Sequence, residues 1–231
     1  MRVHVAFTPA EDVSAPVGIV IDVLRATSTM AQALAAGYRR VLCCSDADEA
    51  RAAAAAEGGA VLAGERGTVR IDGFDFGNSP REFLEPAAET VVLTTTNGTR
   101  LLLAAAARCD LVLVGSLLNL DAVVRAAAET QVEDVAVLCA GVQGELAMDD
   151  AYVAGRMAAA LGGGLTDSSA AAMRLAGSFA TNEEGLGASQ SARNLHASGL
   201  DADIAWCARE SVLDVVPRFS RMVGTAAEVT L

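Results

Sequence analysis

The feature that most constrains the fold is a regular alternation of short apolar runs and alanine-rich segments. The apolar runs predict strands near residues 3–7, 17–23, 41–44, 60–63, 91–95, 111–115 and 135–140. The segments between them predict helices that end near residue 37 and others at 47–57, 99–107, 120–129 and 148–161. This alternation is typical of βα units, so we expect an α/β protein with a mostly parallel sheet. The chain of 231 residues has room for one large domain or two small ones.

The remaining segments are less regular. Glycines and turn formers punctuate residues 68–90, and we expect an ordered excursion there. Two short patterns predict helix starts with a capping box, one at Thr29 with Gln32 and one at Ser79 with Glu82. Beyond residue 168 we expect a helical layer followed by a terminal strand near 212–216.

The composition excludes several classes of protein. The net charge is −12 and only 4% of residues are aromatic, which argues against binding of nucleic acid. The five cysteines form no C-x-x-C pair and fit reduced thiols of a cytoplasmic protein. We see no signal peptide, and charges or glycines interrupt every apolar stretch before it reaches the length of a membrane span.

The loop from Thr94 to Arg100 carries three threonines in a row, then Asn97, Gly98, Thr99 and an arginine. It follows a predicted strand and precedes a predicted helix. The N-terminus of a helix attracts anions, and a guanidinium adds a permanent positive charge. A cap for an ordinary helix needs only one such side chain, so the composition favours an anion site over a cap alone.

Carboxylates follow other predicted strands. Asp22 ends an apolar run, Glu65 follows a second, Asp75 lies in the excursion, and Asp149 and Asp150 open a helix. Each could be structural, as a partner of a nearby arginine or as a first-turn residue of a helix. The loops after residues 23, 63, 93, 114 and 139 should meet, because ligands of such sheets collect at the carboxyl ends of the strands. Carboxylates there, together with a phosphate, form the expected ligand set of Mg²⁺.

Other mechanisms fit the sequence less well. It contains no phosphate-binding G-x-x-x-x-G-K-[ST] loop, no G-x-G-x-x-G after a strand and no G-x-S-x-G elbow. The two histidines, His4 and His196, leave few candidates for a Ser-His-Asp triad. Cys139 could act as a nucleophile, but a small buried core residue is the simpler interpretation.

Several of these stretches together resemble the 2-phosphosulfolactate phosphatase family, the ComB-like proteins. The matching segments lie in the family's order at residues 21–29, 64–67, 73–80 and 94–100, with weaker matches at 115–119, 139–141 with Asp150, and 191–195. Ala192 departs from the family's pattern, in which we expect an arginine beside the serine. The resemblance implies a three-layer α/β/α fold with a mostly parallel or mixed sheet, as a single domain over residues 1–231.

The resemblance also implies an activity. It is the Mg²⁺-dependent hydrolysis of 2-phosphosulfolactate to 3-sulfolactate and phosphate, a step toward coenzyme M. The expected catalytic residues are Asp22, Arg25, Glu65 and Arg100. The expected substrate-binding residues are Thr27, Ser28, Thr29, Thr95, Thr96, Asn97, Gly98, Thr99, Asn119 and Arg193. The expected metal ligands are Asp22 and Glu65, with Asp75 or Asp150 contributing.

Several alternatives stay open on the sequence. Attack by a metal-activated water and a phospho-aspartate at Asp22 are both chemically possible. The substrate could be another small phosphorylated hydroxy acid, or the protein could be a non-catalytic anion binder. Asn119 could equally be a helix-entry residue, whereas Asn78, Ser79 and Thr90 are expected to be structural. The partner is expected to be a small polyanion, with a homodimer as a further possibility.

Overall fold

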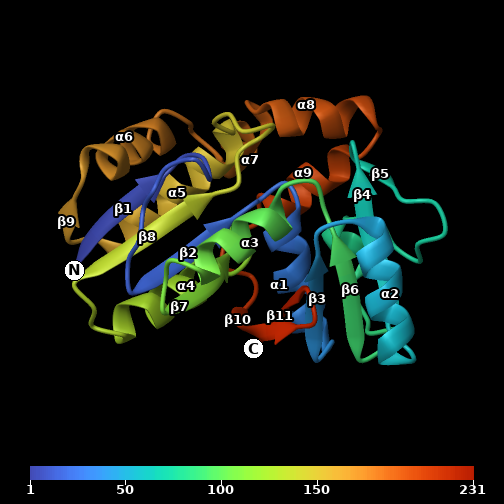
Figure 1. The fold of residues 1–231 in the computed structure, drawn as a ribbon. Helices are drawn as coiled ribbons and strands as arrows, with labels where there is room; N and C mark the ends of the chain where they lie inside the picture. The colour runs from blue at the N-terminus through green and yellow to red at the C-terminus, as the bar shows by residue number, and fades with distance from the viewer.

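The computed structural model describes residues 1–231 and contains one sheet of eleven strands with helices on both of its faces (Figure 1). The strands are β1 (Arg2–Ala6), β2 (Val17–Ile21), β3 (Arg40–Cys44), β4 (Val61–Arg66), β5 (Val69–Arg70), β6 (Thr90–Thr94), β7 (Leu111–Gly115), β8 (Asp134–Cys139), β9 (Gly164–Leu165), β10 (Arg218–Val223) and β11 (Ala226–Thr230). The helices are α1 (Ala26–Ala36), α2 (Ala47–Glu57), α3 (Gly98–Ala106), α4 (Leu120–Glu129), α5 (Met148–Leu161), α6 (Asp167–Ala176), α7 (Asn182–Gly187), α8 (Gln190–Ala197) and α9 (Asp201–Cys207), with a 3₁₀ turn η1 (Pro80–Glu82). The predicted α/β class is confirmed. None of the helices combines the length and the apolar character needed to cross a membrane.

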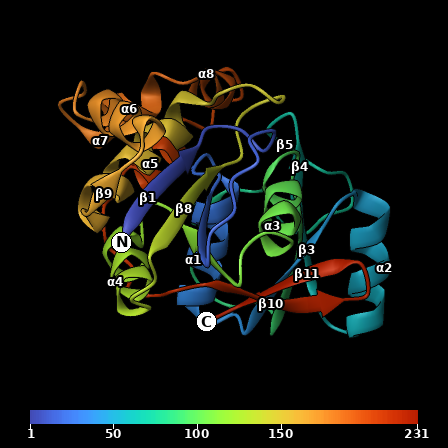
Figure 2. The same cartoon turned by 60° about the vertical axis from the view of Figure 1, so that its left-hand side comes forward.

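The sheet is mixed, with the strand order β5-β4-β6-β3-β11-β10-β7-β2-β8-β1-β9. The strands β4, β6 and β3 form one parallel group, and β7, β2, β8, β1 and β9 form another. The antiparallel hairpin β10–β11 lies between the groups and reaches β7 through a single residue pair, Arg218 with Leu113. Figure 2 shows this hairpin as a long ribbon across the lower part of the molecule.

The central strand β2 explains why helices cover both faces. All five of its residues are buried, as expected for a strand with a packed layer on each side. Ile19 and Ile21 pack in a cluster with Val123 of α4 and Met157 of α5. Val20 points the other way, into a second cluster that contains residues of α1 and α3. The three-layer arrangement therefore follows from the alternation of side chains along the strand.

Three local predictions are corrected. The predicted terminal strand at 212–216 is wrong, because that segment is extended but its backbone bonds to the loop after β7, as Leu213 N donates to Leu118 O. The capping box at Thr29 is wrong as well, because α1 already begins at Ala26. The strand β4 continues to Arg66, so Glu65 lies within a strand instead of following it. The capping box of Ser79 with Glu82 is confirmed.

Candidate functional site

A polar pocket of about 260 Å³ lies at the carboxyl ends of the strands, and we call it the strand-end pocket. It is lined by Asp22, Leu24, Arg25, Glu65, Gly67, Thr68, Asn78, Thr95, Thr96, Asn97, Val142, Gln143, Ser191, Asn194 and Leu195. The loops after β2, β4, β6 and β8 therefore meet there, as the rule for α/β sheets predicts. The loop after β7 does not contribute, and the helix α8 closes the pocket instead.

Asp22 lies one residue beyond the end of β2 and is 9% exposed. Its Oδ1 accepts a long hydrogen bond of 3.4 Å from Ala26 N, whereas its Oδ2 accepts none. Burial, and then the negative charge of Asp149, raise the pKa of Asp22 to about 7, and the charge of Arg25 only partly opposes this. The pocket therefore holds a carboxylate oxygen that lacks both a donor and a full countercharge.

Two more buried acids stand behind Asp22, at the start of α5. Asp150 accepts hydrogen bonds from Val23 N (2.9 Å) and Gly141 N (3.0 Å), so both of its oxygens tie together the loops after β2 and β8. Burial and the charge of Asp149 raise the pKa of Asp150 well above its ordinary value. Asp149 accepts a bond from Ser191 Oγ (3.3 Å), and burial raises its pKa to about 6. Sequence reasoning placed Asp150 at the metal, but Asp149 is the acid whose charge acts most on Asp22.

Glu65 joins two walls of the pocket. Its Oε1 accepts from both the backbone N and the Oγ1 of Thr96, each at 3.1 Å. Its Oε2 accepts from Thr68 N at 2.8 Å. Glu65 therefore fixes the Thr94–Arg100 loop against the turn that follows β4.

The Thr94–Arg100 loop carries unpaired donors and lines the pocket with Thr95, Thr96 and Asn97. The helix α3 begins at Gly98 with no side-chain hydrogen bond at its cap, Asn97, so its first backbone N–H groups lack a cap. The Oγ1 atoms of Thr95 and Thr99 are buried and have no hydrogen-bond partner. A Cβ added to Gly98 would lie 3.0 Å from Asp22 Oδ2 and 3.3 Å from Thr95 Oγ1, so a side chain there would crowd both groups. Uncapped N–H groups at a helix N-terminus are a ready binding site for an anion.

The hydroxyls after β2 are used differently. Thr27 Oγ1 accepts from Asp22 N (3.2 Å), Ser28 Oγ donates to Val23 O (2.8 Å), and Thr29 Oγ1 donates to Asn78 O (2.9 Å). These three residues were predicted to contact substrate, and the structure places their hydroxyls inside the protein, where they hold the backbone.

The guanidinium of Arg25 lies in the wall of the strand-end pocket. It is almost fully buried and pairs with the buried Asp203 of α9 at 2.6 Å. Its Nη2 donates to Thr68 O at 3.2 Å. Arg25 therefore links the loop after β2 to the C-terminal helices.

Asp75 and Arg100 are among the predicted residues that do not line this pocket, as are Asn119 and Arg193. Asp75 is exposed and accepts a hydrogen bond from Leu62 N, away from Asp22. Arg100 is exposed on α3, one turn away from the residues that do line the pocket. The structure therefore does not support Asp75 as a metal ligand of this pocket, and it does not support Arg100 as a residue that binds the anion there.

Asn119 and Arg193 have structural partners. Asn119 Oδ1 accepts from the N and Oγ of Ser116, and its Nδ2 donates to Val114 O and Val215 O, so the side chain is fully bonded. Arg193 is exposed and bonds within α8 and to Ala188 O. The neighbours Ser191 and Asn194 line the pocket in its place, because they lie on the inner face of the same helix.

A divalent cation fits the charge of the strand-end pocket. Asp22 and Glu65 are the predicted metal ligands that line it, and Asp149 adds negative charge behind them. No group of three or more His, Cys, Asp or Glu side chains is placed to hold a metal ion. The open Oδ2 of Asp22 would nevertheless suit a cation whose other ligands are phosphate and water oxygens, which is how Mg²⁺ is usually bound.

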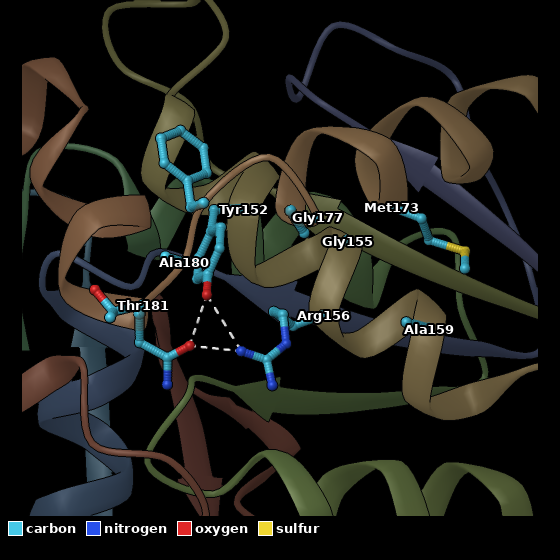
Figure 3. Close-up of a pocket in the computed structure, with 11 residues that line it drawn as sticks. Tyr152, Gly155, Arg156, Ala159, Met173, Gly177, Ala180 and Thr181 are labelled. Atoms are coloured by element: carbon cyan, nitrogen blue, oxygen red, sulfur yellow. Dashed lines mark hydrogen bonds between the residues drawn. The ribbon is translucent and has the colours of Figure 1, made fainter.

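The largest cavity lies elsewhere and differs in character. It has about 530 Å³ and is formed by α5, α6 and the segment that leads into α7 (Figure 3). The Tyr152 hydroxyl and the Arg156 guanidinium both donate to Asn182 Oδ1, and Arg156 also pairs with Glu210. These polar groups bond mainly to one another, and none of the predicted site residues lines this cavity.

Comparisons with known proteins add independent information. A family profile described as 2-phosphosulpholactate phosphatase matches residues 4–221. A protein of Thermus thermophilus named "Probable 2-phosphosulfolactate phosphatase" is 40% identical over 233 residues, which cover 98% of each chain. A protein of Methanothermobacter thermautotrophicus named "2-phosphosulfolactate phosphatase" is 34% identical over 217 residues, which cover 94% of this chain and 92% of that one.

Proposed function

Because the chain belongs to the 2-phosphosulfolactate phosphatase family, a family of phosphoric monoester hydrolases, we propose that its strand-end pocket hydrolyses 2-phosphosulfolactate to 3-sulfolactate and phosphate with the help of Mg²⁺. The observation that carries this proposal is the open Oδ2 of Asp22 beside the uncapped N-terminus of α3. A carboxylate in that position has no use in a pure anion binder, because it repels the ligand.

The residues of the strand-end pocket have different proposed roles according to their charge. The N–H groups at the start of α3 and the hydroxyl of Thr95 would bind phosphate oxygens, which gain negative charge in hydrolysis. Glu65 holds that loop in place through Thr96. Asp22 and Glu65 would hold Mg²⁺, and when bound the ion would supply positive charge to the phosphoryl group and favour ionisation of the attacking water. We leave Asp75 and Asp150 out of this set.

The first test is phosphate release from 2-phosphosulfolactate by protein freed of metal with a chelator. We expect activity to return with Mg²⁺ and to fall about 10³-fold in Asp22→Asn, because this change removes the charge without changing the shape. Arg39→Gln, an exposed ion-pair residue on another surface, is the matched control. Full activity in Asp22→Asn, or full activity without any divalent ion, would contradict the proposal.

The route of attack is a separate question with a separate test. A single turnover in H₂¹⁸O places the label in the released phosphate when water attacks phosphorus directly. With a phospho-aspartate at Asp22, water that attacks the carbon of the acyl phosphate labels the Asp22 carboxylate, whereas water that attacks its phosphorus again labels the phosphate. Reduction with borohydride separates the two routes that label the phosphate, because it traps an acyl phosphate at Asp22 and gives no such product when the intermediate is absent.

The physiological substrate is tested with a panel. We propose 2-phosphosulfolactate over 2-phospholactate and 3-phosphoglycerate, and therefore a role in supplying 3-sulfolactate on a route to coenzyme M. A higher kcat/KM for one of the other phosphorylated acids would support the phosphatase activity. It would also mean that this acid is preferred to 2-phosphosulfolactate as the substrate.

A further inference from the structure

A second cavity of about 450 Å³ adjoins the strand-end pocket, and we call it the arginine cavity. The two spaces share three wall residues, Arg25, Thr68 and Asn78. The other walls of the arginine cavity come from β5, from η1 and from the turn before α9. A small molecule bound in one space could therefore reach the other.

The shared wall contains an unsatisfied side chain. Asn78 is 4% exposed, and its Oδ1 is shut off from solvent without a hydrogen-bond partner. Its amide nitrogen also makes no hydrogen bond but is not among the buried unpaired atoms, so it remains open to the cavities. Buried polar groups are normally paired, and an unpaired one needs an explanation. A bound ligand with hydrogen-bonding oxygens would supply it.

The two spaces differ in charge. The strand-end pocket has two carboxylates, Asp22 and Glu65, against one arginine. The arginine cavity has three arginines against Glu82 and Asp203. Of these two acids, Asp203 is taken by Arg25, and the Oε2 of Glu82 accepts from the backbone of Gly77 and Ser79.

Two arginines of this cavity have free donors. The side chain of Arg81 is 46% exposed, and its Nη1 lies 3.7 Å from Asp203 Oδ1, its only ionic contact. Arg70 donates a single hydrogen bond, from Nη1 to Asp75 O. Both can therefore turn N–H groups toward an anion, and a planar guanidinium suits an oxyanion well.

From this contrast we infer that the arginine cavity binds the sulfonate end of the substrate, with Arg81 as the residue that determines specificity and Arg70 and Asn78 as its helpers. This inference rests on the proposed function. The phosphate and carboxylate sit on the same carbon and are good ligands for a hard cation, so they belong in the acidic strand-end pocket. The sulfonate lies one methylene further out, is a weak metal ligand and stays charged at every working pH, so guanidinium groups suit it better.

The test compares two substrates, 2-phosphosulfolactate and 2-phospholactate, which lacks the sulfonate. In Arg81→Gln we expect the ratio of their kcat/KM values to fall about 10- to 100-fold, mainly through KM for the sulfonated substrate. Arg81→Lys keeps the charge and should recover part of the ratio. Arg39→Gln is the control on a distant surface. An equal loss on both substrates would indicate a structural role, and no change in the ratio would exclude contact; either result overturns the inference.

A binding measurement separates this inference from the proposed function. Calorimetry with 3-sulfolactate needs no turnover, so it decides the matter even if the protein releases no phosphate. We expect wild-type protein to bind 3-sulfolactate at least tenfold more tightly than Arg81→Gln does. Equal affinities would overturn the inference whatever the activity of the enzyme.

Discussion

The segments that follow β2 and β6 have similar compositions but use their hydroxyls in opposite ways. In the first, Thr27, Ser28 and Thr29 at the start of α1 bond to the protein's own backbone, which includes the N–H of Asp22. In the second, Thr95 and Thr99 have no partner, and the helix they introduce has no side-chain cap. A hydroxyl-rich loop is therefore a binding site only when its own backbone does not already use the hydroxyls. The variants below test that difference.

The largest effect should come from closing the contact between the two loops. In Gly98→Ala, the new Cβ would lie 2.7 Å from Ala26 Cβ and 3.0 Å from Asp22 Oδ2. Because both neighbours belong to the other loop, the loops must separate. We expect kcat/KM to fall about 100-fold, since small misplacements at a reacting centre are costly. Steady-state kinetics with a thermal melt as control would check this, and wild-type kinetics in the variant would show that the two loops need not touch.

The second prediction tests the unpaired hydroxyl of Thr95 alone. In Thr95→Val, no hydrogen bond of the free protein is lost, so we expect unchanged or slightly higher stability together with a drop of about 10- to 100-fold in kcat/KM. Denaturant unfolding and phosphate release, measured on the same preparation, give the two numbers. A loss of stability without a loss of activity would mean that the hydroxyl serves the fold.

The ionised carboxylate of Asp22 should lower the free energy of unfolding at high pH. Its folded-state pKa of about 7 exceeds the ordinary value of 3.8, so its contribution to stability is fully present below pH 3.8 and is lost as the pH rises through 7. We expect Asp22→Asn to be more stable than wild type at pH 8, by about 2 kcal/mol, and the gain to shrink toward pH 5. Mg²⁺ should raise the melting temperature of wild type at pH 8 more than that of the variant. A pH-independent difference would disprove the raised pKa.

The smallest effect concerns the loop after β2. In Thr27→Val, Asp22 N loses its hydrogen-bond acceptor in a buried place, so we expect stability to fall by about 1 to 2 kcal/mol. The KM should change less than about threefold, because the hydroxyl does not reach the pocket. Thr95→Val is the matched comparison. A large rise in KM for Thr27→Val would indicate that Thr27 contacts the substrate after all.

The sequence predicted the elements that depend on local periodicity. The helices α2, α4 and α5 and the strand β7 have the predicted bounds, because their local composition is distinctive and glycines follow α2 and α5 directly. The hairpin β10–β11 was missed, since the strand at residues 218–223 is polar and mostly exposed, whereas the apolar segment 212–216 before Pro217 has the composition of a strand. Its position between two parallel groups depends on contacts with β3 and β7 that no local pattern contains.

The candidate site was predictable to the level of loops but not of side chains. The rule that ligands collect at strand ends brought Asp22, Glu65 and Thr95 to one pocket. It could not tell that Asp150 would bond to two backbone N–H groups, or that Arg193 would face away while its neighbour Asn194 faces in. The direction of a side chain depends on the tertiary partners of its element, and one sequence does not show them.

The buried ion pair between Arg25 and Asp203 has a consequence for biosynthesis. The two residues are 178 positions apart, and Arg25 lies in the wall of the strand-end pocket. During translation the loop after β2 emerges early, but its guanidinium has no countercharge until α9 has left the ribosome and docked. A nascent chain can thus contain the pocket residues that follow β2, β4, β6 and β8 and still lack a finished pocket. Appearance of activity would then report the arrival of the last helices, long after the residues that do the chemistry have been made.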